Sequence, residues 1–172
     1  MIKDIIIMRK LVLSCLMMFL TLGMSAQSLV GSWQQESSNS NGRGTYSYSF
    51  DKRGGMAIII DIEQVKNGMT ISLSFVMPGT YKRAGQVLSM NFIREAATVS
   101  VNDIHGGLYD KLSPEDKAKA KAAMALQTDS YRQIIVSSLP ETVTQKIKSI
   151  TANQLVLVIE GKEQKYKRVA SR

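Results

Sequence analysis

Apolar and polar side chains alternate along most of residues 45–92. In the first run, residues 45–50, three tyrosine and phenylalanine side chains alternate with threonine and serine. A repeat of two residues is typical of β-strands with one buried face. Turns are expected at 51–55, 67–68 and 84–85, and the Asn-Gly pair at 67–68 is the strongest of these hairpin signals. The apolar face is predicted to consist of Tyr46, Tyr48, Phe50, Met56, Ile58, Ile60, Ile71, Leu73, Phe75, Leu88, Met90 and Phe92.

One segment has a helical pattern instead. Ser113 and Pro114, followed by two acidic residues, form a capping-box-like helix start. The alanine- and lysine-rich run that follows has high helix propensity, so a helix is predicted near residues 113–138. Its only large apolar side chains before residue 130 are Met124 and Leu126, and we therefore expect it to pack shallowly, as a cap or side brace.

Strand patterns return after Pro140 and continue to residue 169. Pro78 and Gly79 are expected to break or bend the strand that begins after residue 68. Altogether the chain predicts about eight or nine strands, joined mostly by short loops, which favours an antiparallel meander. Such a meander avoids exposed edges most simply by closing into an up-and-down barrel. The predicted fold class is therefore all-β, mainly antiparallel, with one inserted helix.

The first 26 residues are predicted to be a signal peptide. A basic Met8-Arg9-Lys10 start precedes an apolar run over 11–22, and small residues at 23–26 offer a cleavage site. Met8 is a more natural start than Met1. Cleavage would leave residues 27–172 as a single exported domain. Lipidation of Cys15 is the alternative, but too few residues separate Lys10 from Cys15 for an apolar region.

Gly31-Ser32-Trp33 on the first predicted strand resembles the Gly-x-Trp signature of lipocalins. The hairpin over 79–90 and the closing strands over 150–169 are similar to small lipocalin-like domains exported by Gram-negative bacteria. The resemblance implies an eight-stranded barrel, with a periplasmic, cell-envelope or extracellular location. It also implies that Trp33 packs at the closed end against a basic side chain, for which Arg168 is the best match because arginine stacks well on an indole.

Several kinds of chemistry are disfavoured by the sequence. His105 is the only histidine, and beside Gly106-Gly107 it is interpreted as a loop residue rather than a catalytic or zinc-binding one. Asp61 and Glu63 share the polar face of their strand, so we interpret them as exposed carboxylates. No nucleophile elbow or phosphate loop is present, and no enzyme activity, metal or cofactor is predicted. The net charge of +8 is spread along the chain, which argues against a nucleic-acid partner.

Two functions of different classes remain, besides a third and weaker alternative, a hydrolase that uses His105. In the first, the barrel binds a small apolar or amphipathic molecule without a chemical step, and Tyr46, Tyr48, Phe75 and Met90 contact it. In the second, side chains fill the barrel, and the helix that starts at Ser113 contacts a protein partner at the cell envelope.

Overall fold

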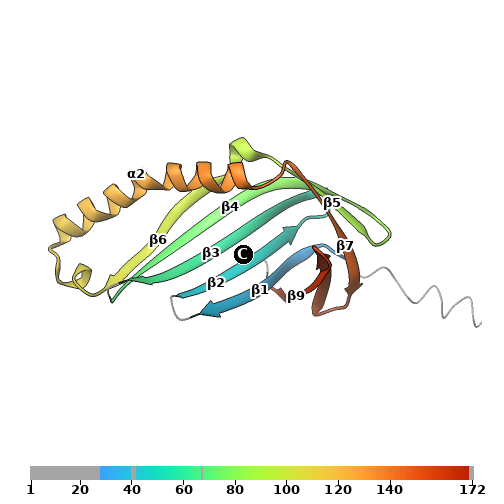
Figure 1. Ribbon diagram of the computed structural model, residues 1–172, viewed down its shortest axis with the longest axis horizontal. Coiled ribbons are helices and arrows are strands. Elements are labelled where there is room, and N and C mark those ends of the chain that lie inside the picture. Colours follow the sequence, from blue (N-terminus) through green and yellow to red (C-terminus); the bar gives the residue numbers. More distant parts are fainter. Residues whose placement is uncertain (1–27, 40–41, 67, 171–172) are drawn as a thin grey trace, which may run out of the picture.

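The computed structural model describes residues 28–39, 42–66 and 68–170 of the chain (Figure 1). The predicted signal peptide, with Cys15, lies outside the described residues. The elements are the strands β1 (Gly31–Asn39), β2 (Gly42–Phe50), β3 (Gly55–Lys66), β4 (Met69–Ala84), β5 (Val87–Phe92), β6 (Thr98–Gly106), β7 (Thr142–Ile150), β8 (Gln154–Ile159) and β9 (Lys162–Val169), the short 3-10 helices η1 (Arg94–Ala96) and η2 (Tyr109–Lys111), and the helix α2 (Pro114–Ser138).

Eight of these strands form a closed antiparallel barrel in the order β1-β2-β3-β4-β5-β7-β8-β9, and β9 pairs back onto β1. The predicted fold class, an all-β up-and-down barrel with one inserted helix, is therefore confirmed. The ninth strand, β6, lies outside this ring and pairs with β4. The segment from η1 to α2 is thus an excursion between two neighbouring strands of the barrel, β5 and β7.

Of the predicted break or bend at Pro78 and Gly79, the break is wrong, because β4 runs through both residues as one strand of 16 residues. What changes there is the partner on one edge. β3 pairs with β4 from Met69 to Thr80, whereas β6 pairs with β4 up to Val76 and β5 pairs with it from Gly79 onward. A proline lacks the N–H of a central ladder position, so it is tolerated where one partner strand ends and the next begins.

The two ends of the barrel differ because the seam between β1 and β9 is short. It covers only Ser32 to Gln34 of β1. At this end, called the closed end, the ring is complete and the interior is packed with side chains. At the other end, called the open end, β1, β2, β3, β4 and β6 continue as a curved sheet (Figure 1). The largest fully buried side chains are Trp33, Tyr48, Tyr166, Met77, Leu88, Met90, Leu155 and Leu157.

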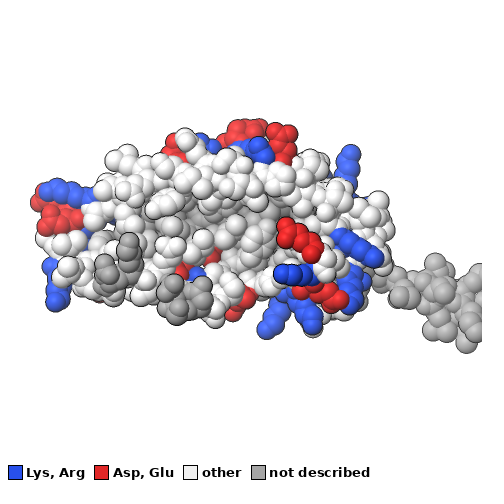
Figure 2. Space-filling view, in the orientation of Figure 1, with Lys and Arg blue, Asp and Glu red and all other residues white. Residues whose placement is uncertain are grey.

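α2 runs beside β6 and packs shallowly, as predicted (Figure 1). The hydroxyl of Ser113 accepts a hydrogen bond from the Asp116 N–H at 3.1 Å, which caps the first turn. Every residue of α2 is at least partly exposed, and only its last turns, with Ile135 and Val136, pack against the core. On the face shown in Figure 2, charged side chains gather at the ends and along one edge, and the middle is largely uncharged.

Candidate functional site

The closed end is sealed by Gly31, Trp33 and Arg168, which the structure brings together. Trp33 and Arg168 are directly opposed in the β1–β9 ladder, and the guanidinium carbon lies 4.3 Å from the centre of the indole. The indole is fully buried and its Nε1 donates to the carbonyl of Leu29 at 2.7 Å. Arg168 also donates to the carbonyls of Val30 and Ser28, each at 3.0 Å. A Cβ at Gly31 would lie 2.6 Å from Arg168 Nη1, so this glycine makes room for the guanidinium.

We expect Arg168→Ala to lower the free energy of unfolding by about 1–2 kcal/mol. The variant loses a partly desolvated cation–π contact and two hydrogen bonds that tie the segment before β1 to β9. Urea denaturation followed by Trp33 fluorescence measures the change. Lys167→Ala is the matched control, because Lys167 is an exposed neighbour on the same strand, and a change within about 0.5 kcal/mol is expected there. Equal effects of the two variants would contradict the role assigned to Arg168.

The four residues predicted to contact a ligand lie at different depths in the barrel. Tyr48, Phe75 and Met90 are buried in the packed core. Tyr46 is half-buried and faces the space beyond that core. Of the four predicted contacts, Tyr46 is therefore the one that lines an open volume.

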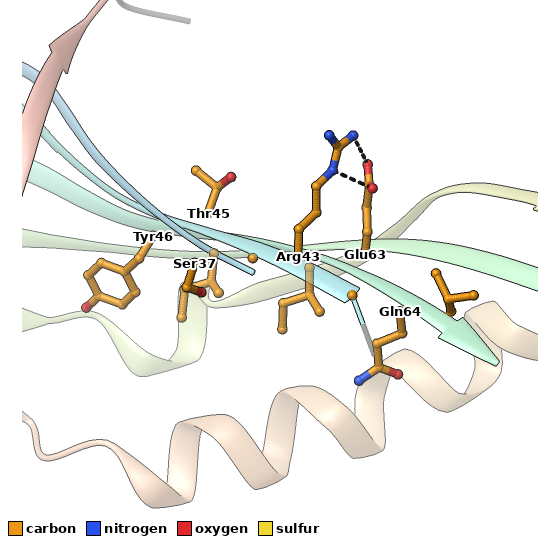
Figure 3. Close-up of a pocket in the computed structure, with 11 residues that line it drawn as sticks. Ser37, Arg43, Thr45, Tyr46, Glu63 and Gln64 are labelled. Carbon is orange, nitrogen blue, oxygen red and sulfur yellow. Dashed lines mark hydrogen bonds and ion pairs between the residues drawn. The ribbon is translucent and has the colours of Figure 1, made fainter. Parts of the chain in front are cut away.

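That volume is a hollow of about 640 Å³ at the open end, which we call the concave hollow. On the sheet's inner face it is lined by Tyr46 of β2 and by Ile60 and Ile62 of β3. Figure 3 shows Tyr46 and Gln64 pointing to the side of the sheet on which α2 passes, and Arg43 and Glu63 pointing to the opposite side. The size falls within the range of small-molecule sites, and Tyr46, Ile60 and Ile62 give the inner face apolar surface beside the polar Ser37 and Gln64.

A set of uncharged polar side chains connects the packed core, to which Tyr48 and Tyr166 belong, with Tyr46 at the concave hollow. Tyr46 Oη lies 3.4 Å from Tyr48 Oη, and Gln145 Nε2 donates to Tyr48 Oη at 3.3 Å. The Tyr166 ring packs edge-on against Tyr48, with 5.3 Å between the ring centres. Gln35, directly opposite Tyr46 in the ladder, donates to Gln164 Oε1 at 2.9 Å. We call this set the neutral polar layer: Gln35, Tyr46, Tyr48, Gln145, Gln164 and Tyr166.

Burial disfavours the charged form of two tyrosines of the layer, Tyr46 and Tyr166. Loss of solvent is the main cause that raises the pKa of Tyr46 and of Tyr166 well above the usual tyrosine range, and the nearby Tyr48 hydroxyl adds to both shifts. Both phenols therefore stay protonated throughout the physiological pH range, and each can donate a hydrogen bond.

The outer face of the open end carries charged groups, around a second hollow of about 800 Å³. Glu63 forms a two-point contact with Arg43, and this hydrogen-bonded ion pair lowers the pKa of the Glu63 carboxyl. Asp61 accepts a hydrogen bond from Ser74 Oγ at 2.6 Å. Both carboxylates are half-buried and partnered, so the prediction that they are simply exposed is wrong.

His105 is on β6, not in a loop as predicted, and it pairs with Thr70 of β4. Its Nδ1 lies 3.0 Å from the Asp103 carboxylate, and both side chains are largely exposed. Among residues 28–39, 42–66 and 68–170, no three His, Cys, Asp or Glu side chains lie close enough to hold a metal ion. Within the same ranges, no helix is both long and apolar enough to cross a membrane.

Sequence analysis missed most of the neutral polar layer. Ile60 belonged to the predicted interior, and Ile62 continues the same alternation. Gln35, Gln145 and Gln164, in contrast, are polar residues on inner-face positions of three different strands, β1, β7 and β9. Their position could have been found only from the strand register.

No protein-family model matches the chain, and no curated protein matches it either. A solved structure with some similarity is the crystal structure of an uncharacterized protein from Bacteroides eggerthii DSM 20697. Its sequence identity to this chain is 14%, and the match covers 83% of this chain and 100% of that chain with a TM-score of 0.35. This degree of similarity names no family and assigns no function.

Proposed function

We propose that this protein is an exported, lipocalin-like binding protein that holds a small apolar or amphipathic molecule in the concave hollow, with no catalytic step. The observation that carries the proposal is the difference between the two ends of the barrel. The closed end is filled by large side chains, whereas the inner face of the open end leaves Ile60, Ile62 and Tyr46 only partly covered. Apolar surface that remains beside a hollow of this size favours a ligand of matching character.

The proposed location is the periplasm, the cell envelope or the extracellular space of a Gram-negative bacterium. It rests on the signal-peptide pattern of residues 1–26 and on the Gly-x-Trp resemblance at Gly31 and Trp33. Cell fractionation tests it, together with the intact mass of the mature chain. A chain that stays in the cytoplasm and still carries residues 9–26, the part of the predicted signal peptide that follows Met8, would contradict export.

Ligand binding is tested with the purified protein and the neutral apolar dye Nile red. We expect Ile62→Asp to weaken dye binding about tenfold or more, because the new carboxylate stands in the concave hollow and must stay hydrated. Val87→Asp is the matched control. Val87 is an exposed apolar residue beside the turn between β4 and β5, and it does not line the concave hollow. Native mass spectrometry of the same preparation, with solvent extraction, detects a co-purified ligand. Dye binding that is unchanged in Ile62→Asp would contradict the assigned site.

A second candidate is an interaction module at the cell envelope, with α2 as the contact surface. The observation that favours it is the exposure of large apolar side chains on this helix, with Leu126 82% and Ile134 62% exposed. The two candidates give different results in the dye experiment. An interior that takes up neither Nile red nor a co-purified molecule, with a partner lost in Leu126→Ser, would favour the interaction module.

A further inference from the structure

The neutral polar layer contains a buried polar atom without a partner. Gln145 is only 8% exposed, and its Oε1 makes no hydrogen bond within the described part of the chain. Its Nε2 is already used by Tyr48 Oη. A buried carbonyl oxygen without a donor costs free energy, so this position favours the arrival of a donor from outside the protein.

The concave hollow meets this layer at Tyr46. Tyr46 lines the hollow, and its hydroxyl lies next to Tyr48 Oη, the same atom that Gln145 contacts. The Tyr46 hydroxyl and the Gln145 amide are therefore no more than two hydrogen bonds apart. Ile60 lies directly beside Tyr46 in the β2–β3 ladder, and Ile62 lies one inner-face position farther out along β3. The arrangement fits a molecule with one polar end and one apolar end.

The charge of the layer limits the polar end to an uncharged group. All six side chains of the layer are uncharged, being three tyrosines and three glutamines. A carboxylate placed there would lose its hydration without gaining a cation, and it would face the unpartnered Gln145 Oε1. A hydroxyl can donate to that oxygen and accept from a tyrosine at the same time.

We propose that the neutral polar layer recognises the hydroxyl head of an uncharged amphipathic ligand, such as a long-chain alcohol, whose apolar chain lies along Ile60 and Ile62. This inference rests on the proposed binding function and adds the class of head group. Gln145 Oε1 accepts from the ligand's hydroxyl, and the Tyr46 hydroxyl turns its proton from Tyr48 Oη to the ligand's oxygen.

The experiment compares 1-decanol with decanoate as competitors of Nile red at pH 8, where the acid is ionised. We expect decanol to bind at least about tenfold more tightly than decanoate. Tyr46→Phe and Gln145→Leu should each weaken decanol binding about two- to tenfold, the effect of one neutral hydrogen bond, and so reduce the preference for the alcohol. Tyr81→Phe and Gln154→Leu are the matched controls. The Tyr81 hydroxyl donates to the carbonyl of Asp51 outside the layer, and Gln154 is exposed.

Three outcomes overturn the inference, and they can be told apart. Decanoate that binds as tightly as decanol contradicts the neutral head group but leaves ligand binding intact. A preference for decanol that persists in both Tyr46→Phe and Gln145→Leu contradicts the assignment to the layer. If Nile red, decanol and decanoate all fail to bind the folded wild-type protein, the proposed binding function fails as well. Thermal unfolding of each variant shows whether it is folded.

Discussion

Replacing Trp33 with alanine should lower the free energy of unfolding by about 3–5 kcal/mol, the range measured when large buried aromatic residues are truncated. The Trp33 side chain is fully buried at the closed end, so its removal leaves a cavity. The carbonyl of Leu29 also loses the indole N–H, and Arg168 loses the ring on which it rests. Since domains of this kind are stable by about 5–15 kcal/mol, the variant loses a large part of its stability.

Urea denaturation followed by far-ultraviolet circular dichroism measures this change, because the variant has no tryptophan. Trp33→Phe is the graded control, since phenylalanine fills part of the cavity and keeps a ring under Arg168. Its loss should be clearly smaller than that of Trp33→Ala. A loss below about 1 kcal/mol in Trp33→Ala would show that the indole does not hold the closed end together.

Gly79→Ala should lower the free energy of unfolding by about 3 kcal/mol, the upper part of the range for overpacking. A Cβ at Gly79 would lie 2.4 Å from the backbone oxygen of Asn91 and 3.3 Å from the Cα of Phe92. These are backbone atoms of β5, which cannot rotate away as a side-chain tip would. Gly79 is also the first β4 residue that pairs with β5. The added methyl group would therefore force β4 and β5 apart at the point where their pairing begins.

Gly44→Ala is the matched control for this second prediction. Gly44 is also within a strand, but the nearest atom to its added Cβ is Ser37 Oγ at 3.4 Å, an ordinary contact. The alanine should be neutral there or stabilise by up to about 1 kcal/mol, because it restricts the unfolded chain. Gly79→Ala should therefore lower the free energy of unfolding, whereas Gly44→Ala should leave it unchanged or raise it. A similar midpoint in urea for both would contradict the close approach of β5 to β4.

The alternation of side chains predicted the strands and their inner face well, because a period of two follows directly from strand geometry. Most of the predicted apolar face is buried, for example Phe50, Ile58 and Leu88. The pairing of β6 was out of reach, because alternation identifies a strand but not its neighbour. Pro78 and Gly79 were interpreted as a break or a bend, since their residue types are rare in central strands. A change of partner on one edge produces the same sequence signal.

The candidate site was only partly accessible from the sequence. Tyr46 and Tyr48 have the same pattern and the same residue type, yet one lines the concave hollow and the other is buried. How deeply each tyrosine lies in the barrel depends on where along β1 the ring closes. The short β1–β9 seam sets that position. The neutral polar layer depends on the same register, because Gln35 and Gln164 are 129 residues apart.

On one edge β4 pairs first with β6 and then with β5. This change of partner affects how fast the amides at the two ends of the barrel exchange their protons and how well each end tolerates insertions and deletions. At Gly79 and Thr80 β4 lies between β3 and β5 in the closed ring, so its amides there are released only when the ring opens. Up to Val76 it lies in a sheet whose last strand is β6, and this sheet can fray from β6 without opening the ring. Insertions or deletions between β5 and β7 would therefore alter the mouth of the barrel and leave the base in place. One continuous strand thus joins a rigid base to a rim that can vary independently.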